Sequence, residues 1–141
     1  MAYATKQDLI DRFGEAELIQ LTDRAEPPAN AVDDTVVARA LTDAENLIDG
    51  HLVPGGYILP LSPVPDLVRR IACDVARYYL HKDAATEQVR KSFEDAMKQL
   101  AGISRGDIKL SAASVAAPGS GGDPIHEAPE PVFTRESLKD Y

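Results

Sequence analysis

The fold class of this chain is decided by one stretch, Pro65-Asp66-Leu67-Val68-Arg69-Arg70-Ile71-Ala72-Cys73-Asp74-Val75-Ala76-Arg77-Tyr78-Tyr79-Leu80. Pro65 suits the first position of a helix, because it lacks the N–H group that is unpaired there in any case. The large apolar residues recur at helical spacings over a wide arc: Leu67, Val68, Ile71, Val75, Tyr78 and Tyr79. So wide an apolar face predicts contact with more than one neighbour, which places this helix at the centre of a bundle.

Two short helices are predicted near the start of the chain. Thr5, with Asp8 three residues later, is typical of a capping box, and Gly14 is suited to end the helix. A second short helix is expected from Glu15 to Leu21. Pro27-Pro28 then forbid a regular helix, so the segment that follows is predicted to be a loop.

Two long helices are predicted on either side of the central one. The earlier helix is capped by one of the aspartates at 33–34, and Gly50 is expected to fray its end, although the apolar pattern continues two residues further. The later helix starts near Asp83 or Thr86 and is expected to end at Gly102. The sequence therefore predicts an all-α fold, a small bundle of about four to five helices.

An extended apolar loop, residues 55–65, joins two of the long helices. Its prolines push the residues before them out of the α region of the backbone map. The simpler interpretation is a connector that tucks Tyr57, Leu59 and Leu61 onto the bundle. The alternative is an exposed strand that pairs with an adjacent subunit by edge addition, which would make these three residues a partner-binding site. No other β-structure is expected.

The composition changes abruptly after residue 110. Residues 111–131 are rich in Ala, Gly, Pro and Ser, and so few bulky side chains cannot offset the entropy cost of ordering the segment. We expect a helical domain over residues 1–110 and a flexible linker over 111–131, with a reach of roughly 25 Å. Residues 132–141 are predicted to be a docking peptide rather than a frayed terminus, with the partner-binding residues Phe133, Thr134, Arg135, Leu138 and Tyr141.

The charge of the chain excludes one class of function. The net charge is −8, with 15 basic and 23 acidic residues, whereas sequence-reading nucleic-acid binders need Lys and Arg to neutralise phosphates. Residues 1–34 carry three basic and eight acidic side chains, and residues 61–110 carry nine basic and seven acidic ones. This is either an ordinary solvated surface or two faces of opposite sign that order subunits head to tail.

The residues that usually carry chemistry are sparse. His51, His81 and His126 show no metal-ligand spacing, and no serine lies in a nucleophile-elbow motif. Cys73 is the only cysteine, so no intramolecular disulfide is possible, and its position in a helix is typical of a small buried hydrophobe. We expect no enzymatic activity, no cofactor and no metal. The N-terminal residues lack the pattern of a signal peptide, and no apolar run approaches the roughly 20 residues that span a bilayer, so no membrane partner is expected.

Three segments together resemble a known family. They are residues 1–14 (MAYATKQDLIDRFG), 57–65 (YILPLSPVP) and 132–139 (VFTRESLK). In their order and spacing they resemble the small head–tail connector, or adaptor, proteins of Mu-like phages and prophages. The resemblance covers the whole chain.

The resemblance implies an all-helical fold and a role in the virion, with assembly in the cytoplasm of the bacterial host. It implies a dodecameric homo-oligomeric ring under the portal protein, in contact with tail-completion or terminator proteins. DNA would pass through the lumen of the ring without specific binding. It also implies that the C-terminal segment reaches the portal. The alternative function is a small helical regulatory module that masks a partner such as a transcription factor.

Overall fold

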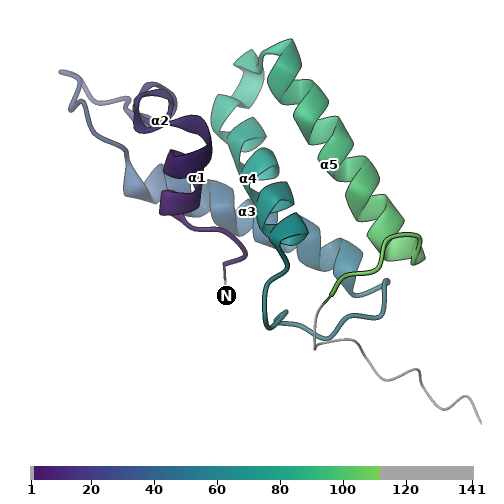
Figure 1. Cartoon of the computed structure of the whole chain (residues 1–141). Helices are drawn as coiled ribbons and strands as arrows, with labels where there is room; N and C mark the ends of the chain where they lie inside the picture. Colours follow the sequence, from purple (N-terminus) through teal and green to yellow (C-terminus); the bar gives the residue numbers. More distant parts are fainter. Residues whose placement is uncertain (1, 112–141) are drawn as a thin grey trace, which may run out of the picture.

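Five α-helices and one 3₁₀ turn make up the described part of the chain in the computed structural model (Figure 1). The structure describes residues 2–111, the side chain of Asp83 excepted. The elements are α1 Lys6–Phe13, α2 Glu15–Thr22, α3 Asp34–Leu52, α4 Asp66–His81, η1 Lys82–Ala84 and α5 Glu87–Arg105. No strand occurs within residues 2–111, so the predicted all-α class is confirmed.

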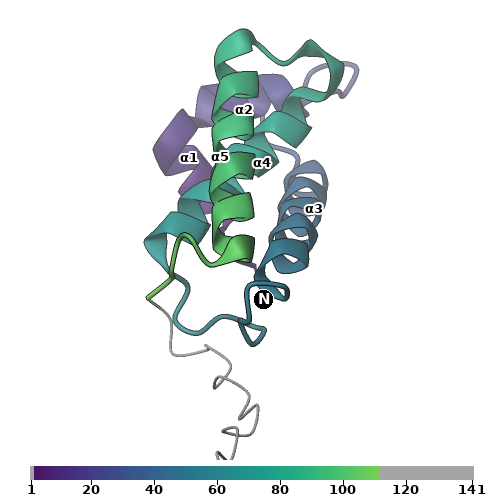
Figure 2. The same ribbon diagram turned by 90° about the vertical axis from the view of Figure 1, so that its right-hand side faces the viewer.

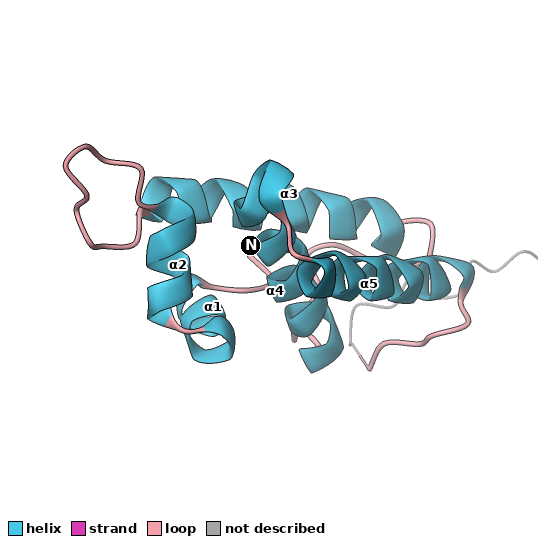
Figure 3. Cartoon of the chain, turned by 90° about the horizontal axis from the view of Figure 1, so that it is seen from above, coloured by secondary structure: helices cyan, strands magenta, loops and turns pink. Residues whose placement is uncertain are grey.

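Helix α4 lies at the centre of the bundle, as predicted. It packs against α3 and α5 and also contacts α1 and α2, and the view from above shows it between α1 and α3 (Figure 3). The helix begins at Asp66 with Pro65 as its N-cap, one residue later than predicted. Its buried residues combine large and small side chains: Val68, Ile71, Ala72, Cys73, Val75, Ala76 and Leu80. The small ones let the neighbouring helices approach closely, which explains why one helix can serve several partners.

Local side chains start three of the helices. The Thr5 hydroxyl accepts the backbone N–H of Asp8 at 3.2 Å, and the Asp8 carboxylate accepts the backbone N–H of Thr5 at 2.8 Å. Asp33 caps α3, and the Thr86 hydroxyl caps α5 by accepting the N–H of Val89 at 3.3 Å. Each contact satisfies a backbone N–H that has no partner within its own helix, and each lies where the sequence predicted it.

Two glycines lie inside their helices: Gly50, where the continuing apolar pattern allowed a longer helix, and Gly102, against the prediction. Helix α3 runs through Gly50 to its last residue, Leu52, and α5 runs through Gly102 to Arg105. The chain leaves α5 at Gly106, whose φ of +84° favours glycine. It then folds back over Gly102, where a Cβ atom would lie 2.9 Å from Ile108 Cδ1. Gly102 therefore provides room for close packing, and its assignment as a helix end was wrong.

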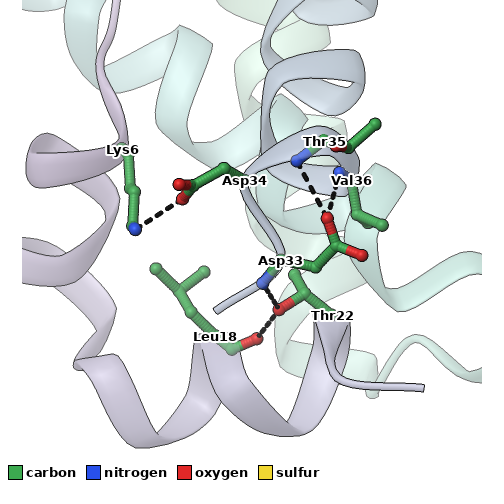
Figure 4. Close-up of polar contacts among 7 residues, drawn as sticks. All are labelled: Lys6, Leu18, Thr22, Asp33, Asp34, Thr35 and Val36. Carbon is green, nitrogen blue, oxygen red and sulfur yellow. Dashed lines mark hydrogen bonds and ion pairs between the residues drawn. The ribbon is translucent and has the colours of Figure 1, made fainter. Parts of the chain in front are cut away.

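The end of α2 is joined to the start of α3 by polar contacts (Figure 4). The buried hydroxyl of Thr22 donates to the carbonyl oxygen of Leu18 at 2.7 Å and accepts the backbone N–H of Asp33 at 3.0 Å. The ammonium group of Lys6 lies 2.5 Å from a carboxylate oxygen of Asp34. These contacts hold the α1–α2 pair against the first turn of α3.

The loop between α2 and α3 extends away from the helices (Figure 3). Inside it, the carboxylate of Asp23 accepts three backbone N–H groups, from Ala25, Ala29 and Asn30, at 2.8 to 3.3 Å. Desolvation raises the pKa of Asp23, but the three N–H groups outweigh it, so the pKa lies below its usual value. One side chain thus organises a loop in which Pro27-Pro28 prevent a regular helix.

Candidate functional site

The apolar loop between α3 and α4 contributes to the core. Tyr57 is 9% exposed, Leu61 is 1% exposed, and Leu59 is half-buried against the core. The segment forms no strand. The structure therefore agrees with the connector interpretation, in which these residues are tucked onto the bundle. A partner-binding role for the same three residues stays a prediction, and it would require burial against the partner in place of burial in the core.

Two contacts hold this loop against the end of α5. The hydroxyl of Tyr57 accepts the backbone N–H of Leu110 at 2.8 Å. A Cβ atom at Gly55 would lie 2.9 Å from the carbonyl oxygen of Ile103, so only glycine allows the turn to lie so close to α5. The described chain ends one residue later, at Ser111, so the loop and the point where the C-terminal segment leaves lie at the same end of the bundle (Figure 1).

Two large apolar side chains at this end face solvent. Val53 is 60% exposed and Ile58 is 55% exposed, and both flank the turn at the start of the loop. We call Val53, Ile58 and the half-buried Leu59 the loop surface. Val53 and Ile58 were not predicted as candidates from the sequence. Alternation in an extended segment would have indicated Ile58, because neighbouring side chains point in opposite directions and Tyr57 points inward.

The predicted docking peptide cannot be compared with the structure. Phe133, Thr134, Arg135, Leu138 and Tyr141 lie outside the described residues. The chain continues for 30 residues beyond Ser111, which follows Leu110, the residue whose backbone N–H binds Tyr57 of the loop.

A charged cluster ties the α1–α2 pair to α4. One carboxylate oxygen of Glu17 accepts from Nη2 of Arg77 at 2.7 Å and from Nε at 3.1 Å. The guanidinium carbon lies 4.3 Å from the centre of the Phe13 ring, and Nε2 of His81 lies 3.6 Å from Glu17. The cluster contains no nucleophile, and residues 2–111 contain no group of three side chains that could hold a metal ion. Its evident role is to fix the α1–α2 pair in place.

A small basic pocket of about 190 Å³ lies between α3 and the end of α4. Three cationic side chains line it: Arg24 after α2, Arg39 on α3 and Lys82 in η1. Tyr79 and Asp43 complete its polar lining, and burial, together with the charge of Asp43, raises the pKa of Tyr79. This site is not evident from the sequence, because its residues come from three separate segments. No local spacing signals their convergence.

The helices that the structure describes include none long and apolar enough to cross a membrane. Residues 3–126, most of the chain, match the family described as Bacteriophage Mu, Gp36. This chain belongs to the phage Mu Gp36 family.

Two relatives are similar over most of their length. The Mu-like prophage FluMu protein gp36 of Haemophilus influenzae is 39% identical over 108 residues, which cover 77% of this chain and 74% of the relative. Gene product J of Escherichia phage Mu is 35% identical over 139 residues, which cover 96% of each chain. The predicted Mu-like phage family is thereby confirmed. The names of these Gp36-family proteins state neither an enzymatic activity nor a place in the particle.

Proposed function

We propose that this Gp36-family protein is a structural virion protein, a head–tail connector whose copies form a ring under the portal vertex. The observation that carries the proposal is the position of the exposed apolar side chains of the loop. The solvent-facing loop surface lies at the end of the bundle where the 30-residue C-terminal segment begins. A rigid helical body with an apolar surface and a tethered peptide is suited to assembly with other proteins.

The described side chains support docking better than catalysis. Among residues 2–111, the Glu17–Arg77 ion pair and the Thr86 cap hold elements of the fold together, and the lining of the basic pocket contains no serine, cysteine or histidine. Cys73, the one thiol, is buried in α4, and burial raises its pKa to about 11. We therefore infer that the protein acts without a cofactor and is not an enzyme.

The proposed partners follow from the same surfaces and from the family. Neighbouring copies form the ring, the portal protein binds the C-terminal peptide, and tail-completion proteins bind the opposite face. DNA passes through the lumen without specific binding, since a chain of net charge −8 repels phosphate on average. The peptide supplies Phe133, Leu138 and Tyr141, and burial of each contributes roughly 1.5–3 kcal/mol before ordering costs are subtracted.

Deletion of residues 132–141 tests this function. Among the described residues the core runs from Tyr3 to Leu110, and we expect the truncated chain to keep its melting temperature within about 2 °C. Loss of the three anchors should weaken binding to purified portal by at least about 100-fold, measured by surface plasmon resonance. A matched control replaces the apolar anchors of the peptide with serine and keeps its length. Full portal binding by the truncated chain would contradict the docking role.

The place of the protein in the particle requires a separate experiment. Induction of a prophage that lacks this gene should yield filled heads and free tails that do not join, visible by negative-stain electron microscopy. Immunogold labelling of wild-type particles should mark the head–tail junction. A protein that stays in the lysate and is missing from purified particles would contradict the connector role, and would favour the regulatory module instead.

A further inference from the structure

The basic pocket between α3 and α4 carries charge that the described structure leaves uncompensated. Five other basic side chains form ion pairs with carboxylates: Lys6, Arg69, Arg77, Lys98 and Arg105. Arg24, Arg39 and Lys82 form none with any residue in the described range, although Asp43 is part of the same lining. With three cations and one carboxylate in its lining, the pocket is suited to bind a small negatively charged group.

We propose that this pocket receives the acidic corner between α1 and α2 of a second copy of the chain. The corner consists of Asp11, near the end of α1, and Glu15, the first residue of α2, and both side chains are exposed. The proposal rests on the proposed function, because it names the contact by which subunits join in a ring.

The carboxylates of the corner are available for such a contact. The Asp11 carboxylate accepts from the uncharged side chain of Gln7 at 2.8 Å, and neither Asp11 nor Glu15 pairs with a cation among residues 2–111. The corner therefore keeps its negative charge, opposite in sign to that of the pocket.

The two surfaces lie on different sides of the molecule. Both the side view and the view from above place α1 and α3 on opposite sides of α4 (Figures 2 and 3). The pocket is formed by α3, the end of α4 and Arg24, which follows the last residue of α2, whereas the corner lies at the opposite end of α2, where it joins α1. A contact between two different patches is heterologous, so each copy can give its corner to one neighbour and receive the corner of the other. Repetition of such a contact closes a ring when the rotation between copies allows it.

Charge reversal tests the contact on each side separately. In the full-length chain, Arg39→Glu together with Lys82→Glu reverses the pocket, and Asp11→Lys together with Glu15→Lys reverses the corner. Each double variant should self-associate at least about tenfold more weakly than the wild type in sedimentation velocity, because like charges then face each other. An equimolar mixture of the two variants should associate again, since every contact in it pairs opposite charges. All four positions are exposed, so we expect the substitutions to leave the fold unchanged, and circular dichroism checks that each variant is folded.

Arg90→Glu on α5 is the matched control, because Arg90 is exposed, basic and outside the pocket. A carbodiimide, which joins amines to carboxylates, should link Lys82 of one copy to Asp11 or Glu15 of another. Mixing ¹⁴N- and ¹⁵N-labelled chains identifies links between copies by mass spectrometry.

Three results would overturn the proposal. The first is unchanged association of both double variants, and the second is a wild-type chain that stays monomeric up to about 1 mM. The third concerns the variant with the reversed pocket charge: loss of its binding to a short DNA duplex, with self-association unchanged, would mean that the pocket binds phosphate groups. None of these results decides the head–tail location, which is measured in particles.

Discussion

Replacement of Leu61 by alanine should lower the free energy of unfolding by about 3–4 kcal/mol. The Leu61 side chain is 1% exposed, so the change removes buried carbon atoms and leaves a cavity in their place. Measured losses for such substitutions are roughly 2.7–5 kcal/mol, and they are smallest where the surroundings can collapse. Here the loop is held at Tyr57 by the hydrogen bond from Leu110 and at Gly55 by its close approach to α5. Collapse is therefore only partial, which favours the middle of the range.

Urea unfolding followed by circular dichroism at 222 nm measures this loss. A domain of this size is stable by roughly 5–15 kcal/mol, so the variant should still fold, with a melting temperature on the order of 10–20 °C lower. Ile58→Ala is the control in the same loop, because Ile58 is 55% exposed and its truncation should change stability by less than about 1 kcal/mol. A loss below about 1 kcal/mol for Leu61→Ala, or equal losses for the two variants, would refute the argument that burial of Leu61 stabilises the fold.

The same burial decides how the docking role of the loop should be tested. Aspartate at Leu59 and Leu61 would place a carboxylate in the core at 61 and should unfold the monomer, so loss of assembly would prove nothing. Ile58→Asp leaves the core intact and changes the loop surface alone.

Three further predictions concern stability and reactivity. Gly55→Ala should lower the free energy of unfolding by about 1–3 kcal/mol, because the new Cβ would meet a backbone oxygen at 2.9 Å. Gly50→Ala should raise it by about 0.5–1 kcal/mol, because Gly50 lies in a helix and its Cβ would meet nothing within 4 Å. A gain in stability at both sites, measured by urea unfolding, would contradict this prediction. Burial raises the pKa of Cys73 to about 11, so at neutral pH its thiol should react with iodoacetamide only as fast as the protein unfolds. Mass spectrometry measures the rate of labelling. Labelling at the rate of a free peptide would exclude a buried thiol. The folded pKa of Asp23 lies below its unfolded value, so its carboxylate stabilises the fold above the unfolded pKa of about 4 and loses that effect as the pH falls through the folded value. Asp23→Asn should therefore be less stable than the wild type at pH 6, and the difference in urea midpoint should shrink below pH 4; a pH-independent difference would contradict the assignment.

The sequence by itself determined where helices begin and which helix is central. Thr5, Asp33 and Thr86 cap their helices through side-chain oxygens that accept nearby backbone N–H groups, and such contacts depend only on residues two or three positions away. The wide apolar arc of residues 65–80 likewise predicted a helix with several neighbours, because periodicity reports burial directly.

Tertiary structure decided the helix ends, the packing of the loop and the basic pocket. Gly102 resembles a helix stop in sequence, yet α5 continues through it to Arg105, and the glycine leaves room for Ile108, which packs where a side chain would be. Tyr57 meets Leu110, 53 residues away, and Arg24, Arg39 and Lys82 converge from three elements. Such contacts depend on how whole helices pack. A local sequence pattern reflects interactions between residues within a few positions of one another. The packing of α3, α4 and α5 determines which distant side chains come together.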